Sequence, residues 1–426
     1  MEKKWTVALI GCGGRGARTY GRLMREEFPN HYEMKALCDI NPATLALQGE
    51  RLCVTEENRF TDENVFFEKK RADLLLICTQ DKDHVRMTLK GLSLGYDILV
   101  EKPIATTREE CSRLLEAQKK YGGKVLVGHV LRYAPAFSKA EELLKEGAIG
   151  KLIAVDDIEQ VGYGHYAHSY IRGNWRRDDE STPMIMAKCC HDLDILHHYA
   201  GSRCKSLSST GALTWFKPEN APEGSADRCL DCKYAETCPF SAKRIYLYRF
   251  RDNPEYVFSR IITYPNPLNE DEILKALRNG PYGRCVYRCD NNVVDHQMTV
   301  MTFENGVTAS LTMTGFTGNG GRILRLHGSL GEIIIDEGQS TVTLKAYGKE
   351  AQEWNITDLA SKGVEGHGGG DYCIVSDIYR ILSGEGEART SLESAIESHL
   401  MAIAAEESRL SGGKLVYVHS PDKQTD

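Results

Sequence analysis

The feature that most constrains the fold is a glycine-rich turn directly after a short apolar run, 7–10, near the N-terminus. The turn consists of Gly11, Cys12, Gly13, Gly14, Arg15 and Gly16. The segment 16–28 after it has the pattern of an amphipathic helix. Glycines at this spacing allow a tight turn, close approach of the backbone to a pyrophosphate, and close packing of helix on strand. The unit predicts the start of a doubly wound α/β domain.

Further apolar runs and helical segments alternate along the next hundred or so residues. The runs are 34–38, 74–78, 98–100 and 125–127, and the helical segments are 81–94 and 107–121. Apolar runs without polar alternation suit strands that are buried on both faces of a parallel sheet. We therefore expect residues 1–128 to form a Rossmann domain with a doubly wound parallel sheet.

The pattern changes from about residue 129 onward. Longer, partly alternating strands are expected at 152–160, 205–213, 296–303, 306–314, 322–328 and 331–347. Two helices, 371–383 and 391–410, follow. These elements predict a C-terminal α+β domain, 129–426, with a large open and mostly antiparallel sheet, so the fold class is α/β overall. An irregular segment at about 214–292 is expected to be an insertion, and we call it the insertion below.

An acidic residue follows the second expected strand. Asp39 stands at its end, where a carboxylate accepts hydrogen bonds from the adenosine ribose hydroxyls of a dinucleotide and repels a 2′-phosphate. Ile40 and Asn41 come next, with no arginine to hold that phosphate. The cofactor predicted is NAD rather than NADP; the alternative is a glycine turn without a ligand.

Two polar clusters follow later strands of the predicted parallel sheet. Thr79 and His84 come after one strand, and Glu101, Lys102 and Pro103 come after the next. Ligands of open α/β sheets bind beyond the carboxyl ends of the strands, and we call this space the crevice. Lys102 is placed there to hydrogen-bond a substrate hydroxyl. The alternative is a solvated ion pair between Glu101 and Lys102.

These motifs together resemble a known family. The resemblance rests on Gly11-x-Gly13-x-x-Gly16, Thr79…His84, Glu101-Lys102-Pro103 and His191-x-x-Asp194, and it covers essentially the whole chain. The chain is similar to the glucose–fructose oxidoreductase/inositol dehydrogenase (Gfo/Idh/MocA) family. The resemblance implies that Lys102 and His191 flank a substrate carbinol beside the nicotinamide, with His191 as general base and Lys102 stabilising charge on oxygen. The expected cofactor-binding residues are Gly11, Gly13, Gly14, Arg15, Gly16, Asp39, Thr79, His84, Glu101 and Lys102.

The chain departs from that family at one position. Many of its polyol dehydrogenases carry an aspartate one helical turn before the histidine, and here that position is Ala187. Lys188 lies three residues before His191, so both can share a helix face and we expect Lys188 to line the pocket as a third catalytic residue. The alternative for His191 is a helix histidine buried by packing.

Substrate-binding residues are expected from three further segments. The stretch 162–176 is rich in His, Tyr, Arg and Trp, which stack on sugar rings or donate to hydroxyls. A glycine-rich loop also presents His367. The alternative is that these segments are surface loops rich in polar residues. The predicted substrate-binding residues are Arg132, Tyr133, His168, Arg172, Trp175, Asp194 and His367.

The fourteen cysteines include a closely spaced group. Cys229, Cys232 and Cys238 lie in the insertion, and Cys204 lies upstream. Such spacing suits a structural zinc ion, with no metal or an iron–sulfur cluster as alternatives. Single cysteines within apolar runs indicate a reducing compartment and no disulfide framework.

The whole-chain properties limit the class of partner. The net charge of −7 gives no reason to expect nucleic acid, and no stretch approaches the roughly 20 apolar residues of a membrane span. No export signal is evident, so a cytoplasmic location is expected. The substrate expected is a small carbohydrate, and the resemblance implies a dimer or tetramer formed through the open sheet.

Two enzymatic functions and one other class are expected from these features. The first is an NAD-dependent oxidoreductase acting on a secondary hydroxyl of a sugar, cyclitol or glycoside. The alternative is a redox-neutral NAD-dependent glycosidase or lyase working through a transient 3-keto sugar, with a second base from Tyr163, His165, His168 or Tyr133. The third is a non-catalytic sensor of NAD or sugar.

Overall fold

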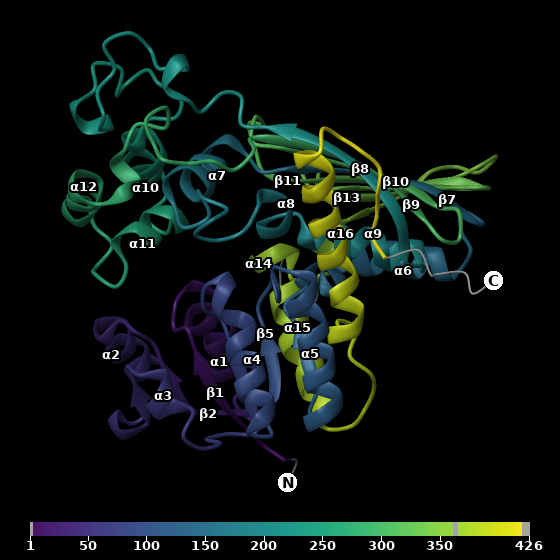
Figure 1. Ribbon diagram of the computed structural model, residues 1–426, viewed down its shortest axis with the longest axis horizontal. Coiled ribbons are helices and arrows are strands. Elements are labelled where there is room, and N and C mark those ends of the chain that lie inside the picture. Colours follow the sequence, from purple (N-terminus) through teal and green to yellow (C-terminus); the bar gives the residue numbers. More distant parts are fainter. Residues whose placement is uncertain (1–2, 361–364, 420–426) are drawn as a thin grey trace.

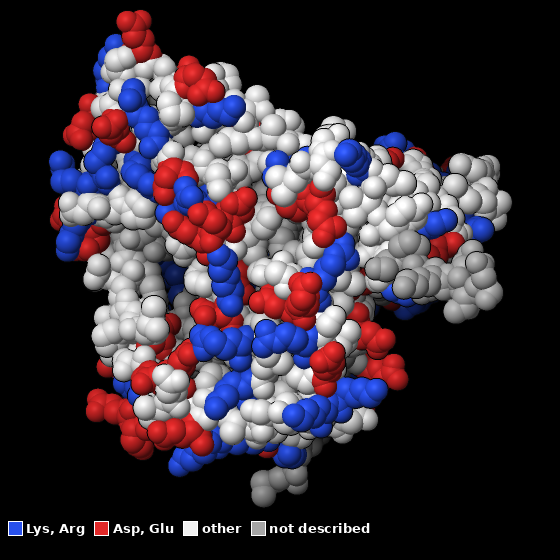
Figure 2. All heavy atoms as spheres, viewed as in Figure 1, with Lys and Arg blue, Asp and Glu red and all other residues white. Residues whose placement is uncertain are grey.

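The computed structural model describes residues 3–360 and 365–419, which contain two sheets. Figure 1 shows the N-terminal sheet and its helices in the lower half, the second sheet at the upper right, and the insertion at the upper left. On the face in Figure 2, acidic and basic side chains are interspersed, and the surface is hollowed between the N-terminal part and the insertion. Within the described ranges, no helix is long and apolar enough to cross a membrane.

The N-terminal sheet is parallel throughout and confirms the Rossmann prediction. Its strand order is β3-β2-β1-β4-β5-β6, and the apolar runs of the sequence are its buried strands. The two-residue strand β3 is too short to show a pattern. The strands are β1 (Trp5–Ile10), β2 (Tyr32–Cys38), β3 (Arg59–Phe60), β4 (Leu74–Ile77), β5 (Asp97–Val100) and β6 (Val125–Val127).

Helices connect these strands on both faces of the sheet. The segment after the glycine turn forms η1 and α1, and the two later helical segments form α4 and α5 as expected. The Asn41 side chain caps α2 by accepting from the backbone N–H groups of Ala43 and Thr44. The helices are η1 (Gly14–Gly21), α1 (Arg22–Glu26), α2 (Pro42–Arg51), α3 (Glu63–Phe66), α4 (His84–Ser93) and α5 (Arg108–Tyr121).

The second sheet is mixed, with one parallel pair, β7 with β10, among antiparallel neighbours. Its order is β14-β13-β12-β11-β7-β10-β9-β8-β15. The single strand expected at 331–347 is two strands, because the backbone turns where Ser340 has φ +58°. The strands are β7 (Leu152–Gln160), β8 (Cys204–Ala212), β9 (His296–Phe303), β10 (Thr308–Thr314), β11 (Gly321–Gly328), β12 (Gly331–Asp336), β13 (Thr341–Ala346), β14 (Gln352–Asn355) and β15 (Val416–Tyr417).

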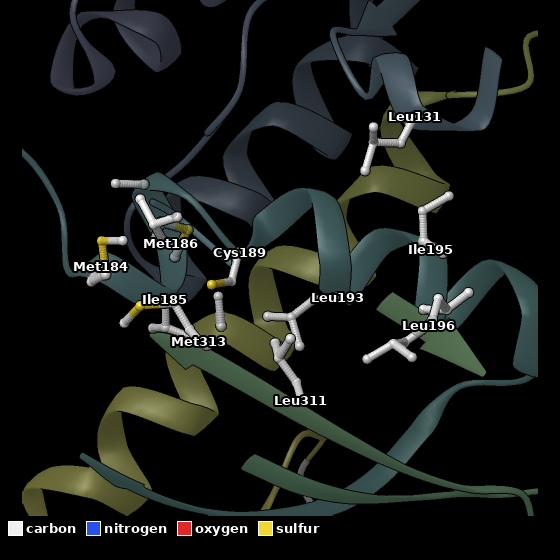
Figure 3. Packing of buried hydrophobic residues seen from close by; sticks show 14 of the residues in the cluster. Leu131, Met184, Ile185, Met186, Cys189, Leu193, Ile195, Leu196, Leu311 and Met313 are labelled. Atoms are coloured by element: carbon white, nitrogen blue, oxygen red, sulfur yellow. The ribbon is translucent and has the colours of Figure 1, made fainter. Parts of the chain in front are cut away.

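Two short helices lie between the sheets, α8 (Met184–Ala187) and α9 (Cys190–Ala200). Figure 3 shows Leu193 of α9 directed toward Leu311 of β10, within the largest apolar cluster. This packing leaves the other side of α9 to face η4 (Val130–Tyr133), which follows β6. Residues of α9 that do not pack on the sheet are thereby held near the carboxyl edge of the Rossmann sheet.

The last helices return to the N-terminal part. Ile374 and Val375 of α15 (Gly370–Leu382) belong to the same apolar cluster as Leu9 of β1, and α16 (Leu392–Leu410) contributes Leu392 to the other Rossmann cluster. The chain after residue 128 therefore supplies side chains to both cores. The division at 128/129 stays a prediction.

The insertion has apolar packing of its own. It contains α10 (Arg249–Asp252), α11 (Val257–Thr263) and α12 (Glu270–Asn279), and Phe216 stacks on Tyr166 at 5.4 Å between ring centroids. Tyr246 and Ile273 are buried in the same cluster as the second sheet. The insertion is thus joined to the main core by aromatic and aliphatic contacts.

Candidate functional site

The glycine turn lies where the strand order of the Rossmann sheet reverses, between β1 and β4. Gly11 has φ +89°, and a Cβ there would lie 2.4 Å from the carbonyl oxygen of Cys78. A Cβ on Gly13 or Gly14 would meet no described atom within 4 Å. The turn is therefore closed against the sheet on one side and open on the other, where helix η1 presents its first N–H groups. This arrangement fits a dinucleotide pyrophosphate.

Asp39 links the end of β2 to this turn. Its Oδ2 accepts from the Cys12 N–H at 2.7 Å, and its Oδ1 accepts from the Asn41 N–H at 2.9 Å. The side chain is half-buried, so each oxygen keeps a lone pair that can face a ligand. The carboxylate therefore fits the ribose hydroxyls expected of NAD.

Two residues predicted to contact the cofactor, Arg15 and Glu101, bind each other. Arg15 Nε donates to Glu101 Oε1 at 2.9 Å, and the Tyr20 hydroxyl donates to the same oxygen at 2.7 Å. Burial opposes ionisation, but Arg15 still holds the pKa of Glu101 below its usual range. Glu101 is therefore an ionised partner of Arg15. The expected alternative, a solvated pair of Glu101 with Lys102, is wrong.

His84 joins two strand ends. Its Nδ1 lies 2.7 Å from the carbonyl oxygen of Pro103, and its Nε2 lies 3.2 Å from that of Thr79. The ring is buried, and a backbone carbonyl oxygen lies within hydrogen-bond distance of each ring nitrogen. The structure thus places His84 where it fixes the segment that carries Lys102.

Lys102 reaches across the crevice to α8. Its Nζ donates to the carbonyl oxygen of Ala187 at 2.7 Å, at the position where the expected aspartate is missing. Helix α8 ends at Ala187 and α9 begins at Cys190. The expectation that Lys188 and His191 share one helix face is therefore wrong, because a break separates them.

Lys188 is held by a buried carboxylate that the sequence did not reveal. Its Nζ lies 3.2 Å from Oε1 of Glu159 on β7. Arg322 of β11 pairs with Glu159 and, at 2.6 Å, with Asp192 of α9. Glu159 of the second sheet thus holds the Lys188 side chain in place at the crevice.

His191 is buried beside other histidine rings. Its ring centroid lies 5.7 Å from that of His129 and 5.8 Å from that of His367. Burial, followed by the neighbouring Lys102 ammonium, holds the pKa of His191 well below its usual range. Its Nδ1 has no hydrogen-bond partner in the described part of the chain. His191 is therefore a neutral imidazole.

The structure brings His165, rather than the predicted His168, toward the two lysines. Burial, with the charges of Lys188 and Lys102, lowers the pKa of His165 to about 3. His165 lies on α7 (Tyr163–Tyr166), whereas His168 lies on η5 (Ala167–Arg172). His168 stacks between two rings of the insertion, Phe258 at 4.3 Å and Tyr282 at 4.8 Å.

Two other predicted substrate residues serve the packing of the insertion and of the domain junction. Arg172 is buried and donates to the carbonyl oxygens of Arg284 and Phe240, both at 2.8 Å. Trp175 donates its indole N–H to the Asp81 carboxylate at 3.2 Å. The structure does not bring these side chains to the crevice.

Arg132, Tyr133 and Asp194 form internal bonds instead of lining the crevice. Arg132 donates from Nε and Nη2 to the two oxygens of Asp194, at 2.7 and 2.6 Å, and both side chains are buried. The Tyr133 hydroxyl lies 3.2 Å from Oγ1 of Thr390. The Arg132–Asp194 bonds fix α9 against η4, and the Tyr133–Thr390 contact joins η4 to the segment before α16.

His367 stands at the edge of the crevice. Its Nδ1 lies 3.2 Å from Oδ1 of Asp371, and its ring faces that of His191. The residues gathered around the crevice are Lys102, His165, Lys188, His191 and His367. The sequence did not single out Glu159 or Asp371, because each acts through a contact between distant segments.

The four predicted metal ligands do not all come together, because Cys204 lies apart from the other three. Cys204 lies in β8, with its Sγ 3.8 Å from the carbonyl oxygens of Ser206 and Thr302. Cys229, Cys232 and Cys238 line a cavity of about 20 Å³ in the insertion. In residues 3–360 and 365–419, no group of three or more His, Cys, Asp or Glu could hold a metal ion. The zinc prediction is therefore not supported, and the apolar packing of the insertion supplies the cohesion that a metal was expected to give.

The insertion also reaches the glycine turn, which the sequence did not predict. The Tyr264 hydroxyl donates to the carbonyl oxygen of Cys12 at 3.3 Å and accepts from Nε2 of Gln48 at 3.0 Å. Arg18 of η1 lies over the Tyr264 ring, 5.8 Å from its centroid. The glycine turn is thus bordered by the insertion as well as by the sheet.

Comparison with known proteins gives one relative over most of the chain and others over about half of it. The chain is 24% identical over 395 residues to the putative oxidoreductase YteT of Bacillus subtilis, covering 88% of each. It is 24% identical over 194 residues to inositol 2-dehydrogenase/D-chiro-inositol 3-dehydrogenase of Lactiplantibacillus plantarum, covering 45% of this chain and 51% of that protein. It is 22% identical over 212 residues to 2,7-anhydro-N-acetylneuraminate hydratase of Mediterraneibacter gnavus, covering 48% and 51%.

A solved structure and two family models agree with this result. Levoglucosan dehydrogenase in complex with NADH and levoglucosan superposes with a TM-score of 0.71 at 18% identity, covering 98% of this chain and 100% of that one, which shows a common fold. The model of an oxidoreductase family with an NAD-binding Rossmann fold matches residues 5–129. The model of that family's C-terminal α/β domain matches residues 141–417. The chain therefore belongs to the Gfo/Idh/MocA family of NAD-binding oxidoreductases.

Proposed function

We propose that this protein transfers a hydride between NAD and a secondary hydroxyl of a sugar, cyclitol or glycoside. The observation that carries the proposal is the position of Lys102. It lies at the carboxyl edge of the Rossmann sheet, close to the glycine turn, and reaches Ala187 directly before the segment that leads to His191. Relatives named as an inositol dehydrogenase and a levoglucosan dehydrogenase support a polyhydroxylated substrate.

Different residues of the crevice would have different roles in this reaction. The glycine turn and Asp39 would hold NAD, which supplies the hydride acceptor at its nicotinamide ring. Lys102 would donate a hydrogen bond to the reacting oxygen and stabilise negative charge that develops there. Lys188, His165 and His191 would bind the remaining hydroxyls, as donors or acceptors in a partly desolvated site.

A redox-neutral glycosidase or lyase is the second candidate. The observation that favours it is the number of imidazoles near the crevice, because His165 and His367 are additional to His191. Elimination next to a transient ketone needs a second base. The relative named as a hydratase of an anhydro sugar gives this candidate some support.

One assay separates the two candidates. The protein is incubated with NAD and a panel of free sugars, cyclitols and aryl glycosides, and the absorbances of NADH and of released phenol are followed together. NADH that rises with substrate consumed identifies a dehydrogenase. Phenol that rises without net NADH identifies the redox-neutral enzyme. No change of either kind, with every compound on the panel, contradicts both.

Replacing Asp39 with alanine should raise the Kd for NAD by about 10- to 100-fold, because charge-assisted hydrogen bonds contribute about 1.5–3 kcal/mol each. The Kd for NADP should change less, because the variant no longer repels the 2′-phosphate. Fluorescence titration with NADH and NADPH measures the corresponding constants of the reduced cofactors, which carry the same adenosine ribose. Asp97→Ala is the control, since this carboxylate accepts from the Lys124 N–H at the opposite edge of the sheet. Equal constants in wild type and Asp39→Ala would remove Asp39 from the cofactor site.

We also propose that a second copy of the chain covers the open face of the second sheet. Met298 and Val300 on β9 are 57% and 58% exposed, and Ile158 on β7, which is in line with Met298 across Thr312 of β10, is 38% exposed. Apolar side chains that lie close together on a sheet face are typical of an interface. Light scattering should give a dimer or tetramer, and the double variant Met298→Lys/Val300→Lys should give a lower mass. A wild-type monomer at micromolar concentration would contradict this.

A further inference from the structure

We propose that His367 and Asp371 form the acid/base pair of this active site, in place of the carboxylate–imidazole pair that Ala187 rules out beside His191. The inference rests on the proposed function, because it needs a substrate hydroxyl in the crevice. Proton transfer is thereby assigned to helix α15 and the loop before it.

The carboxylate of Asp371 is fixed from three sides. Arg15 Nη1 lies 2.9 Å from both of its oxygens. Gly370 packs so closely on η4 that a Cβ would lie 2.4 Å from the carbonyl oxygen of Val130. Gly366 has φ +62°, and a Cβ there would lie 2.3 Å from Asp371 Oδ2. The loop that carries His367 therefore passes directly over a carboxylate that cannot move away.

This geometry sets the tautomer of His367. Burial opposes ionisation of Asp371, but Arg15 and the hydrogen bond from His367 hold its pKa at about 2. An ionised carboxylate can only accept, so the proton lies on Nδ1 of His367, at 3.2 and 3.3 Å from the two oxygens. Arg15 Nη1 is also a donor, but it lies 3.5 Å from Nδ1 and only 2.9 Å from each Asp371 oxygen, so it donates to the carboxylate. Nε2 therefore keeps a free lone pair.

His367 is better placed to transfer the proton than the ionisable groups around its ring. His191 is its nearest imidazole, and His165, Arg15 and Asp371 are the further ionisable groups that interact with it. His191 is buried, and its Nδ1 has no partner within the described ranges that could orient the ring. His367 has both an orienting carboxylate and a side chain that is 37% exposed. It can therefore exchange a proton with water after each turnover.

The proton step balances in both directions. As the C–H bond of the carbinol gives its hydride to NAD, the hydroxyl proton passes to Nε2 of His367 and the carbinol becomes a carbonyl. The imidazolium then loses a proton to solvent. In the reverse direction Nε2 gives its proton to the carbonyl oxygen. Asp371 and Arg15 are positioning residues, because they act through the imidazole.

The first test needs no substrate. The protein is labelled with ¹⁵N-histidine, and ring signals are assigned to nitrogen type by two-bond correlations, with His367→Gln identifying one set among the thirteen histidines. We expect His367 to be protonated on Nδ1, and Asp371→Asn to remove that preference. A ring protonated on Nε2, or an equal mixture in the wild type, would overturn the proposal. His327→Gln, which removes a similarly exposed histidine paired with Asp156 at 3.0 Å, is the control.

The second test uses a compound that the wild type turns over. His367→Gln should lower kcat/KM by about 10²- to 10³-fold and flatten its rise with pH, with the Kd for NADH changed less than about threefold. Asp371→Asn should lower kcat more than it raises KM. If His367→Gln keeps the wild-type pH profile while His191→Gln loses it, the pair is overturned. If the wild type turns over nothing, the proposed function has failed, and the tautomer alone decides the pair.

Discussion

Replacing Lys102 with methionine should lower kcat by about 10²- to 10³-fold on any sugar that the protein oxidises, the effect of removing one donor to a developing oxyanion. Methionine keeps the length and apolar stem of the side chain, so the loss isolates the ammonium group. Glu101 stays bound to Arg15 and Tyr20, which leaves the glycine turn supported. The Kd for NADH should therefore change less than about threefold.

Steady-state kinetics and NADH titration measure the two quantities. Lys124→Met is the matched control, because Lys124 also donates to a backbone carbonyl, that of Ile381, away from the crevice. The control should keep wild-type kcat. A Lys102→Met enzyme with at least a third of the wild-type kcat would show that Lys102 has a structural role only.

Replacing Arg132 with methionine should lower the free energy of unfolding by about 3–5 kcal/mol, the usual effect of removing one partner from a buried ion pair. The Asp194 carboxylate would remain buried without the two hydrogen bonds at 2.6 and 2.7 Å. Removing both charges in Arg132→Met/Asp194→Leu should recover part of the loss. Arg86→Met, which breaks surface pairs with Asp83 and Glu63, should cost about 0–1 kcal/mol.

The loss in Arg132→Met should depend on pH. Burial opposes ionisation, but Arg132 and His129 hold the pKa of Asp194 below its usual range. A carboxyl with a lowered pKa contributes stability above its unfolded value of about 4, and this contribution is lost as the pH falls through the folded value. Urea unfolding of wild type and variant should therefore converge on acidification. A difference that stays constant from neutral to strongly acidic pH would contradict this account of the pair.

The Rossmann domain could be predicted because its signals are local. The apolar runs become β1, β2, β4, β5 and β6, and the glycine turn needs only its own φ angles and the strand beside it. In the second domain, alternating patterns also placed β7 and β9 correctly. The hairpin turn at Ser340 was missed, although the segment 336–341 that forms it has only polar residues and one glycine.

Much of the site depends on contacts that sequence patterns do not encode. His165 and His168 are three residues apart, and the rings of Phe258 and Tyr282 decide that His168 packs into the insertion. Cys204 matches a ligand pattern by spacing, yet β8 carries it into the second sheet. The pairing of Asp371 with Arg15 joins the two ends of the chain. Long-range packing therefore decides which of several chemically suitable residues reaches the site.

The most direct test of the central claim is a single-turnover experiment with the enzyme in excess over a sugar found on the panel. Oxidation of a carbinol by bound NAD predicts a rise of NADH absorbance in both enzymatic candidates, and this rise should slow with substrate deuterated at the reacting carbon. In the dehydrogenase the NADH remains, and in the redox-neutral enzyme it decays as product forms. Product that forms without NADH at any time would contradict hydride transfer as the function of this protein.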